Sequence, residues 1–255
     1  VNEYIDAGKK PDQIKAKELE VAVNKFKQSG IYTLETELYW TQYDKTTKKE
    51  EKLSSTPSSL TSSFAKSCAT SKMTGYITKD GFFYEMSSSE KLGIVKHNDK
   101  YYIVSNADSS GSISNTISAT TTTENIWRIN SNKYSIKNIG EDEYIKNLNV
   151  ASKTSSEGKT IFEVDYPTSN GFFSANAEAV LDGGTTYKLF AQSSSSSIEM
   201  FVATQCEVTV TDTEVVIDIY YSYNSTYTYH IVNTFKDLGV DKLTSKLAGI
   251  TFPEN

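Results

Sequence analysis

The chain has 255 residues, a formal net charge of -6 and a hydrophobic content of 37%, and its aromatic residues include 17 Tyr and 11 Phe. This length is sufficient to bury a substantial core in one sheet-rich domain. An acidic balance without a basic stripe argues against nucleic acid as a partner, because phosphates require clustered Lys or Arg. No apolar run reaches the length of a membrane-spanning helix.

The first part of the chain predicts a tether followed by a helix. The chain begins with Val1 and carries no signal peptide, so we expect a processed N-terminus, with residues 1–10 as a tether and residues 11–255 as a single domain. Pro11 and Gly30 are typical of a helix start and a helix end. The polar face of this helix is mostly basic, which is typical of a solvated face. The alternative is that this face contacts an anionic membrane surface. Its apolar face consists of Ile14, Leu19, Ala22, Val23 and Phe26.

A strand is predicted directly after this helix. In residues 32–40, mostly apolar side chains alternate with mostly polar ones. A period of two places every second side chain on the same face of a strand. The basic run at residues 45–52 is balanced by Glu50 and Glu51, and predicts a solvated turn between strands. Residues 54–71 predict a loop or a short helix. One face of the strand consists of Tyr32, Leu34, Thr36, Leu38 and Trp40.

Two hairpins are predicted in the next part of the chain. Asp80 and Gly81 form a strong two-residue turn signal, and residues 97–100 form a second turn. The expected pairs are Ile77 with Tyr84 and Gly75 with Met86 in the first hairpin, and Ile94 with Ile103 and Val95 with Tyr102 in the second. Further predictions are a loop or edge strand at residues 106–125, a short helix at residues 141–149, and strands at residues 160–166, 172–181 and 185–192.

The strongest pattern lies between residues 198 and 235, where three alternating runs predict antiparallel strands with one apolar face. A turn at residues 211–214 aligns the apolar faces of the first two strands. The next loop must contain three residues, 224–226, because a two-residue loop would place the apolar sets on opposite faces. Wide sheets of long strands twist and curl. We therefore expect an α+β fold, in which a curled antiparallel sheet, or half-barrel, has helices covering its concave face. The expected pairs are Val210 with Val215, Val208 with Ile217, Tyr221 with Tyr229 and Ile219 with Ile231.

The sequence supplies little for catalysis, and we expect no enzyme, no cofactor and no metal. It contains no nucleophile elbow, paired-histidine metal motif, phosphate-binding glycine loop or calcium loop. His97 falls in a hairpin turn and His230 on the more polar face of a strand, so both are predicted to be ordinary surface or structural residues. A hydrolase would require one of them to contact a carboxylate in a cleft. Cys68 and Cys206 are predicted to be free thiols, with a disulfide as the alternative.

The predicted site is the shared apolar face of the sheet. In one interpretation helices cover this face completely and form a solid core. In the other the sheet curls further than the helices fill, and an acyl-chain cleft remains. The candidate ligand-binding residues are Leu34, Leu38, Trp40, Phe82, Tyr84, Met86, Met200, Val202, Ile217, Ile219, Tyr221 and Tyr229.

The order of these elements resembles the LolA-like lipoprotein-carrier superfamily, including lipoproteins of the LppX and LprG type. The segments that carry the resemblance are residues 77–84 (ITKDGFFY), residues 234–240 (TFKDLGV) and the closing residues 250–253 (ITFP). The resemblance implies an incomplete antiparallel barrel whose concave apolar face is lidded by helices and holds lipid. It also implies a lipid anchor on a cysteine just upstream of Val1, a residue that this chain does not contain.

These observations together predict a non-enzymatic bacterial protein that is extracellular and anchored at the membrane surface. Its abundance of Ser, Thr, Asn and Tyr resembles the exported surface proteins of Gram-positive bacteria. The expected partner is a lipid or lipopeptide held by burial of apolar area. The alternative is a structural or interaction module of the cell envelope, with a filled core and an exposed strand face on which Tyr39, Tyr220 and Tyr223 meet a protein or glycan.

Overall fold

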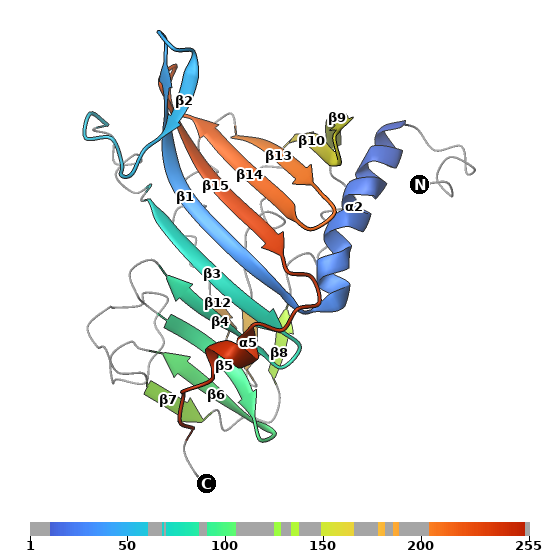
Figure 1. Cartoon of the computed structure of the whole chain (residues 1–255), viewed down its shortest axis with the longest axis vertical. Coiled ribbons are helices and arrows are strands. Elements are labelled where there is room, and N and C mark those ends of the chain that lie inside the picture. The colour runs from blue at the N-terminus through green and yellow to red at the C-terminus, as the bar shows by residue number, and fades with distance from the viewer. Residues whose placement is uncertain are drawn as a thin grey trace.

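The fold of the chain is described by a computed structural model over residues 11–60, 68, 70–86, 91–105, 125–128, 134–137, 149–165, 178–181, 186–188 and 204–252 (Figure 1). The predicted tether, residues 1–10, lies outside these residues. So do most of the loop predicted at residues 106–125 and most of the helix predicted at residues 141–149. The last residue of each of these two segments, Asn125 or Asn149, is described and begins a strand.

The N-terminal helix, α2 (Pro11–Ser29), has the predicted bounds. Its end is set by Gly30, which has a φ of 63° and whose N–H donates to the Phe26 carbonyl at 2.9 Å. A glycine in this left-handed conformation is a common helix terminator because it has no Cβ to clash. The apolar face of α2 is buried through Leu19, Ala22, Val23 and Phe26. No helix among the described residues is both long enough and apolar enough to cross a membrane.

An antiparallel sheet of twelve strands forms most of the described fold (Figure 1). Its order is β7-β6-β5-β4-β3-β1-β15-β14-β13-β10-β9, with β2 paired to β1, so the sheet is open, with β7 and β9 at its two ends. The antiparallel character predicted from the alternating runs is confirmed. Its strands are β1 (Tyr32–Asp44), β2 (Lys49–Lys52), β3 (Ser71–Thr78), β4 (Gly81–Met86), β5 (Lys91–His97), β6 (Lys100–Ser105), β7 (Asn125–Arg128), β9 (Asn149–Ser156), β10 (Lys159–Asp165), β13 (Thr204–Val210), β14 (Val215–Ser222) and β15 (Tyr227–Lys236).

The remaining described elements are a small sheet and one short helix. The small sheet has the order β12-β11-β8. Its strands β11 and β12 lie within two of the predicted strands, whereas β7, β8 and β9 were not predicted. The turn predicted at residues 45–52 is shorter than expected, because residues 49–52 form the exposed strand β2. A short helix, α5, precedes the end of the described chain. The bounds are β8 (Tyr134–Lys137), β11 (Glu178–Leu181), β12 (Thr186–Lys188) and α5 (Leu243–Lys246).

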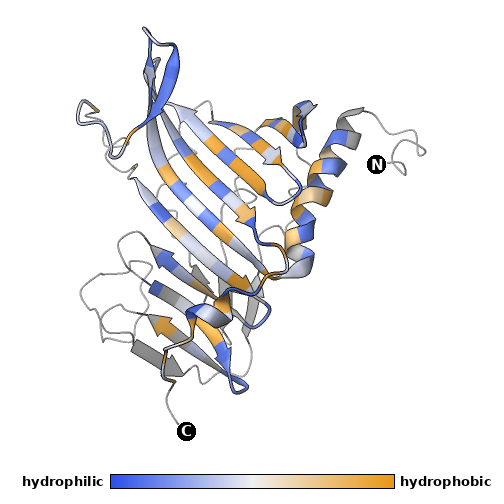
Figure 2. Ribbon diagram, in the orientation of Figure 1, coloured by the Kyte–Doolittle hydropathy of each residue, from blue (hydrophilic) through white to orange (hydrophobic). Residues whose placement is uncertain are grey.

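The register of the C-terminal strands is the predicted one. Burial of every second side chain fixes which residues oppose each other, and Figure 2 shows the resulting alternation of hydrophobic and hydrophilic residues along these strands. The three-residue loop is closed by Tyr223, whose N–H donates to the Tyr227 carbonyl at 2.9 Å. The side chain of Asn224 accepts from the N–H groups of Thr226 and Tyr227 at 2.8 Å. The pairs are Val210 with Val215, Val208 with Ile217, Ile219 with Ile231 and Tyr221 with Tyr229.

The two hairpin predictions had different outcomes. The β5–β6 hairpin has the predicted register, and its turn residues Asn98 and Asp99 have φ values of 48° and 59°. The prediction for the β3–β4 hairpin was wrong by two residues, because Lys79 and Asp80 form the turn and Gly81 begins β4. A shift of two residues leaves each side chain on its predicted face. The observed pairs are Thr78 with Gly81, Ile77 with Phe82, Gly75 with Tyr84 and Met73 with Met86.

The sheet has an apolar cluster on each of its faces. We call the face that carries Leu34 and Trp40 the inner face. Its cluster extends across the sheet and includes the buried residues of α2. On the opposite, outer face, β4, β5 and β6 contribute Phe83, Val95, Tyr102 and Val104 to a second cluster. The C-terminal segment packs against this second cluster through Leu243, Leu247, Ile250 and Phe252.

Candidate functional site

The structure brings together nine of the twelve predicted ligand-binding side chains in the inner-face cluster. Seven of them are buried, and Leu38 and Tyr221 are partly buried against the others. Met86 lies in β4 opposite Met73, and its side chain lies outside the described part of the structure. Met200 and Val202 lie outside the described residues. The seven buried members are Leu34, Trp40, Phe82, Tyr84, Ile217, Ile219 and Tyr229.

Trp40 has extensive contacts within this cluster. Its indole Nε1–H donates to the Cys68 carbonyl at 2.9 Å, and the side chain is 0% exposed. Its ring lies 5.0 Å from the Tyr229 ring and 6.0 Å from the Tyr223 ring, measured between centroids. Tyr223 therefore packs against the inner-face cluster, although it was predicted on an exposed strand face together with Tyr39 and Tyr220.

One polar pair lies on the inner face. The Thr36 hydroxyl donates to Asn233 Oδ1 at 2.8 Å, and both residues are buried. The two residues oppose each other directly in β1 and β15. A buried polar group costs little when it is hydrogen-bonded and much more when it is not. This pair therefore joins two central strands of the sheet without breaking the apolar surroundings.

Replacing Thr36 with valine is expected to lower the free energy of unfolding by about 1–2 kcal/mol, because the hydroxyl donor to Asn233 is removed while the side-chain volume is retained. Urea denaturation followed by circular dichroism measures the change. Thr36→Ser keeps the hydroxyl and serves as the control. A Thr36→Val protein as stable as the wild type would contradict a structural role for this hydrogen bond.

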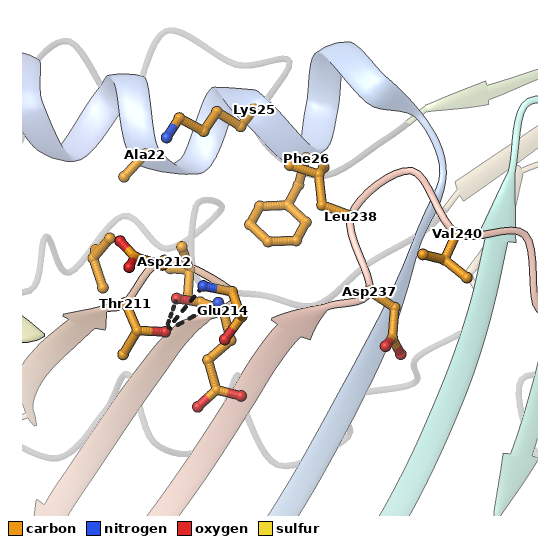
Figure 3. Close-up of a pocket in the computed structure, with 12 residues that line it drawn as sticks. Ala22, Lys25, Phe26, Thr211, Asp212, Glu214, Asp237, Leu238 and Val240 are labelled. Atoms are coloured by element: carbon orange, nitrogen blue, oxygen red, sulfur yellow. Dashed lines mark hydrogen bonds between the residues drawn. The ribbon is translucent and has the colours of Figure 1, made fainter. Parts of the chain in front are cut away.

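A cavity of about 410 Å³ lies where α2 meets the β13–β14 turn and the segment after β15 (Figure 3). Val210 and Val215 belong to the same face as the predicted residues Ile217 and Ile219, so the cavity adjoins the inner-face cluster. Sequence patterns on the individual strands gave no sign of this cavity, because its walls come from segments nearly 200 residues apart in the chain. Its apolar lining consists of Ala22, Phe26, Val210, Val215, Leu238 and Val240.

Charged and polar groups line the rest of this cavity. Lys25 of α2 lies on one side, and Asp212 and Glu214 lie in the β13–β14 turn (Figure 3). This turn is held by Thr211, whose hydroxyl oxygen accepts from the Glu214 N–H at 3.1 Å. Lys242 pairs with Asp237 at 2.6 Å, and this hydrogen bond lowers the pKa of Asp237. The cavity thus combines an apolar wall with a polar one.

The two histidines have different surroundings. His97 is exposed at the β5–β6 turn and stacks on the Phe252 ring at 4.2 Å between centroids. His230 was predicted on the polar face of a strand, and this placement holds, but the residue is 7% exposed and has defined partners. Its Nδ1 lies 3.1 Å from both carboxylate oxygens of Asp218, and its Nε2 lies 3.2 Å from Thr41 Oγ1.

The His230 contacts meet one requirement for a hydrolase, because a histidine is within hydrogen-bond reach of a carboxylate and of a hydroxyl. A nucleophile must also be reachable by substrate, and Thr41 is only 7% exposed. None of the three residues lines the cavity beside α2. Their hydrogen bonds are made between side chains of neighbouring strands, as expected for a structural polar network.

No disulfide joins Cys68 and Cys206, in agreement with the predicted thiols, and both side chains are buried. Burial is the largest cause that raises the pKa of Cys206, so its thiol stays protonated at neutral pH. Within the described ranges, no group of three or more His, Cys, Asp or Glu side chains is arranged to hold a metal ion.

A scan against models of known protein families gives no match for this chain, and no curated protein matches it. Its function is therefore inferred from the geometry of the chain itself.

Proposed function

We propose that this chain is a non-enzymatic binding protein that takes an apolar ligand, a lipid or lipopeptide, between α2 and the inner face of its sheet. The observation that supports the proposal most directly is the cavity of about 410 Å³ with an apolar wall. Small-molecule sites typically enclose about 300–1,000 Å³ and have mostly apolar walls with a few polar groups. In this proposal α2 acts as the helical cover of a concave sheet.

Affinity in such a site comes from removal of apolar surface from water. Burying about 400 Å² of acyl chain contributes about 10 kcal/mol before the costs of binding are subtracted, at about 25 cal/mol per Å². The polar wall, with Lys25, Asp212 and Glu214, is suited to a polar headgroup that stays at the opening. This mode of binding agrees with a place of the protein at a bacterial cell surface.

Ligand uptake is tested by titration with a fluorescent fatty acid and by native mass spectrometry of the purified protein. Ala22→Phe is expected to weaken binding at least 10-fold, because Ala22 lines the cavity and a phenyl ring would fill part of it. Val21→Phe is the matched control, since Val21 is the neighbouring residue on α2 and is 46% exposed. The proposal fails if the wild-type protein carries no ligand and takes up no fatty acid, or if both variants bind equally well.

A second candidate function is a structural or interaction module with a filled core. The observation that favours it is the burial of the seven predicted residues, each of which is at most 4% exposed. Under this alternative the inner face serves only stability. Absence of fatty-acid uptake, together with unchanged thermal stability on addition of lipid, would favour this function over the first.

A further inference from the structure

The outer face of the sheet carries a row of three stacked rings on its central strands. Tyr39 of β1 and Tyr220 of β14 both oppose His230 of β15 in the register. The Tyr39 and His230 rings are 5.0 Å apart and inclined by 9°, and the Tyr220 and His230 rings are 5.7 Å apart and inclined by 24°. We call these three residues the aromatic row. It lies on the face opposite the cavity, so binding at this row is independent of the proposed function.

The aromatic row is held in place by hydrogen bonds and burial. Asp218 and Thr41 fix the two nitrogens of His230. Burial, followed by the charges of Asp218, Glu37 and Glu50, raises the pKa of Tyr39 to about 12. The Tyr39 phenol is therefore neutral at physiological pH. The row presents rigid rings with little side-chain entropy to lose on binding.

One end of the aromatic row already holds a cation. The Lys52 ammonium lies 4.2 Å from the centroid of the Tyr39 ring and 2.5 Å from Glu37 Oε1. Glu37 precedes Tyr39 by two residues in β1, so its carboxylate lies beside the ring on the same face. A ring and a neighbouring carboxylate together form a favourable site for an ammonium or guanidinium group.

The same arrangement recurs at the other end of the row, with more negative charge. Asp218 precedes Tyr220 by two residues in β14, Glu207 of β13 opposes Asp218, and Glu163 of β10 opposes Glu207. Like charges placed directly opposite each other destabilise a sheet unless a cation lies between them. Within the described residues, no lysine or arginine forms an ion pair with Glu163 or Glu207 or lies over the Tyr220 ring.

The surroundings of Tyr220 agree with this concentration of negative charge. Burial is the largest cause that raises the pKa of Tyr220, and the charges of Glu207, Asp218 and Glu163 come after it. Solvent reaches this region, because Glu163 is exposed. By contrast, the outer face of β4, β5 and β6 is apolar and is covered by the C-terminal segment of the same chain.

We infer that the outer face around Tyr220, Asp218, Glu207 and Glu163 docks a basic protein segment in an extended conformation. Charge complementarity selects a cationic partner, and the Lys52–Tyr39–Glu37 contact shows how this sheet holds a cation. The three carboxylates span about 10 Å across the strands, and alternate side chains of an extended segment lie about 7 Å apart. Two cationic side chains in alternate positions therefore fit along this row, one beside Asp218 and next to the Tyr220 ring, and one between Glu207 and Glu163. Arginine is favoured because it stacks on rings and pairs with carboxylates through two hydrogen bonds.

The test uses a fluorescein-labelled peptide with arginine at every second position and serine between, titrated with the whole chain and followed by fluorescence anisotropy at low salt. We expect saturable binding that Glu163→Gln combined with Glu207→Gln weakens at least 10-fold. Tyr220→Leu is expected to weaken binding about 3-fold, the effect of one cation–π contact, whereas Tyr220→Phe binds as the wild type does. The matched control is Glu51→Gln combined with Asp80→Asn, which removes two exposed acids outside the patch and is expected to leave the dissociation constant within 2-fold.

Several results would overturn the inference. One is wild-type protein that does not bind the arginine peptide, or binds it no better than a peptide with serine in place of arginine. Another is equal weakening in the patch variant and the control variant, which would show a response to net charge alone. Binding of a neutral oligosaccharide that requires Tyr220, without binding of the peptide, would identify a glycan-binding face instead. Circular dichroism and thermal unfolding of each variant verify that the sheet is intact.

Discussion

Replacing Trp40 with alanine is expected to lower the free energy of unfolding by about 4 kcal/mol, the largest effect that we predict for a side-chain truncation in this chain. The indole is fully buried and packs on the inner face against side chains of neighbouring strands. Truncation leaves a cavity beside Tyr229, and it also removes the donor to the Cys68 carbonyl. Both effects act in the same direction. Equilibrium unfolding in urea, monitored by tyrosine fluorescence and circular dichroism, measures the loss.

The control for this measurement is Trp40→Phe, which retains most of the apolar volume and loses only the hydrogen bond, at an expected cost of about 1–2 kcal/mol. Tyr43→Ala truncates another aromatic residue of β1 that is 37% exposed, and is expected to cost less than about 1 kcal/mol. A Trp40→Ala protein that is as stable as Tyr43→Ala would contradict a packed inner face and would favour an open one.

Much of the sheet is predictable from the sequence because burial and strand geometry impose the same period. In the strands between Val208 and Ile231 every second side chain is apolar, and only one register places this set on one face. This constraint was strong enough to exclude a two-residue loop in favour of residues 224–226. The same reasoning gathered Leu34, Phe82 and Ile217 from distant hairpins into one cluster.

Features that depend on contacts between elements were not predictable in the same way. The cavity forms where α2 meets the β13–β14 turn, and neither segment alone indicates the other. The cluster that includes Phe83 and Val95 requires cover from the C-terminal segment, about 150 residues later in the chain. His230 was assigned to the polar face correctly, but its burial results from the rings of Tyr39 and Tyr220 on the two adjacent strands.

The two proposals assign different physical roles to the two faces of one sheet. In the first proposal the inner face binds by burial of apolar area, which is tolerant of ligand identity but sensitive to cavity volume. In the second proposal the outer face binds by charge and ring contacts, which are weakened by salt and are sensitive to single carboxylates. Salt therefore separates the two activities in one protein sample. We expect fatty-acid uptake to change little between low and high ionic strength, while binding of the arginine peptide falls steeply.

Replacing Gly81 with alanine is expected to lower the free energy of unfolding by about 3 kcal/mol, because this glycine is needed in β4 rather than in a turn. Its φ of 157° lies in a region that residues with a Cβ rarely adopt. A Cβ at this position would lie 2.4 Å from the Ile94 carbonyl oxygen and 2.8 Å from the Val95 Cα, both of them backbone atoms of β5. The strand pair would have to separate to accommodate the methyl group. Gly81 is required by this close approach of β5 and not by a turn. Taking residues 80 and 81 as the turn therefore gave a register that was wrong by two residues.

The control for Gly81 is Gly158, in the β9–β10 turn, which has a φ of 75° and open space where a Cβ would lie, with no atom within 4 Å. Gly158→Ala is expected to cost about 1 kcal/mol, the effect of the left-handed backbone alone. The difference between the two variants in urea unfolding isolates the contribution of the clash with β5. Amide hydrogen exchange should also show loss of protection in β4 and β5 for Gly81→Ala and none in these strands for Gly158→Ala. Equal destabilisation by the two substitutions would contradict the close approach of β5 to Gly81 and, with it, the corrected register of the β3–β4 hairpin.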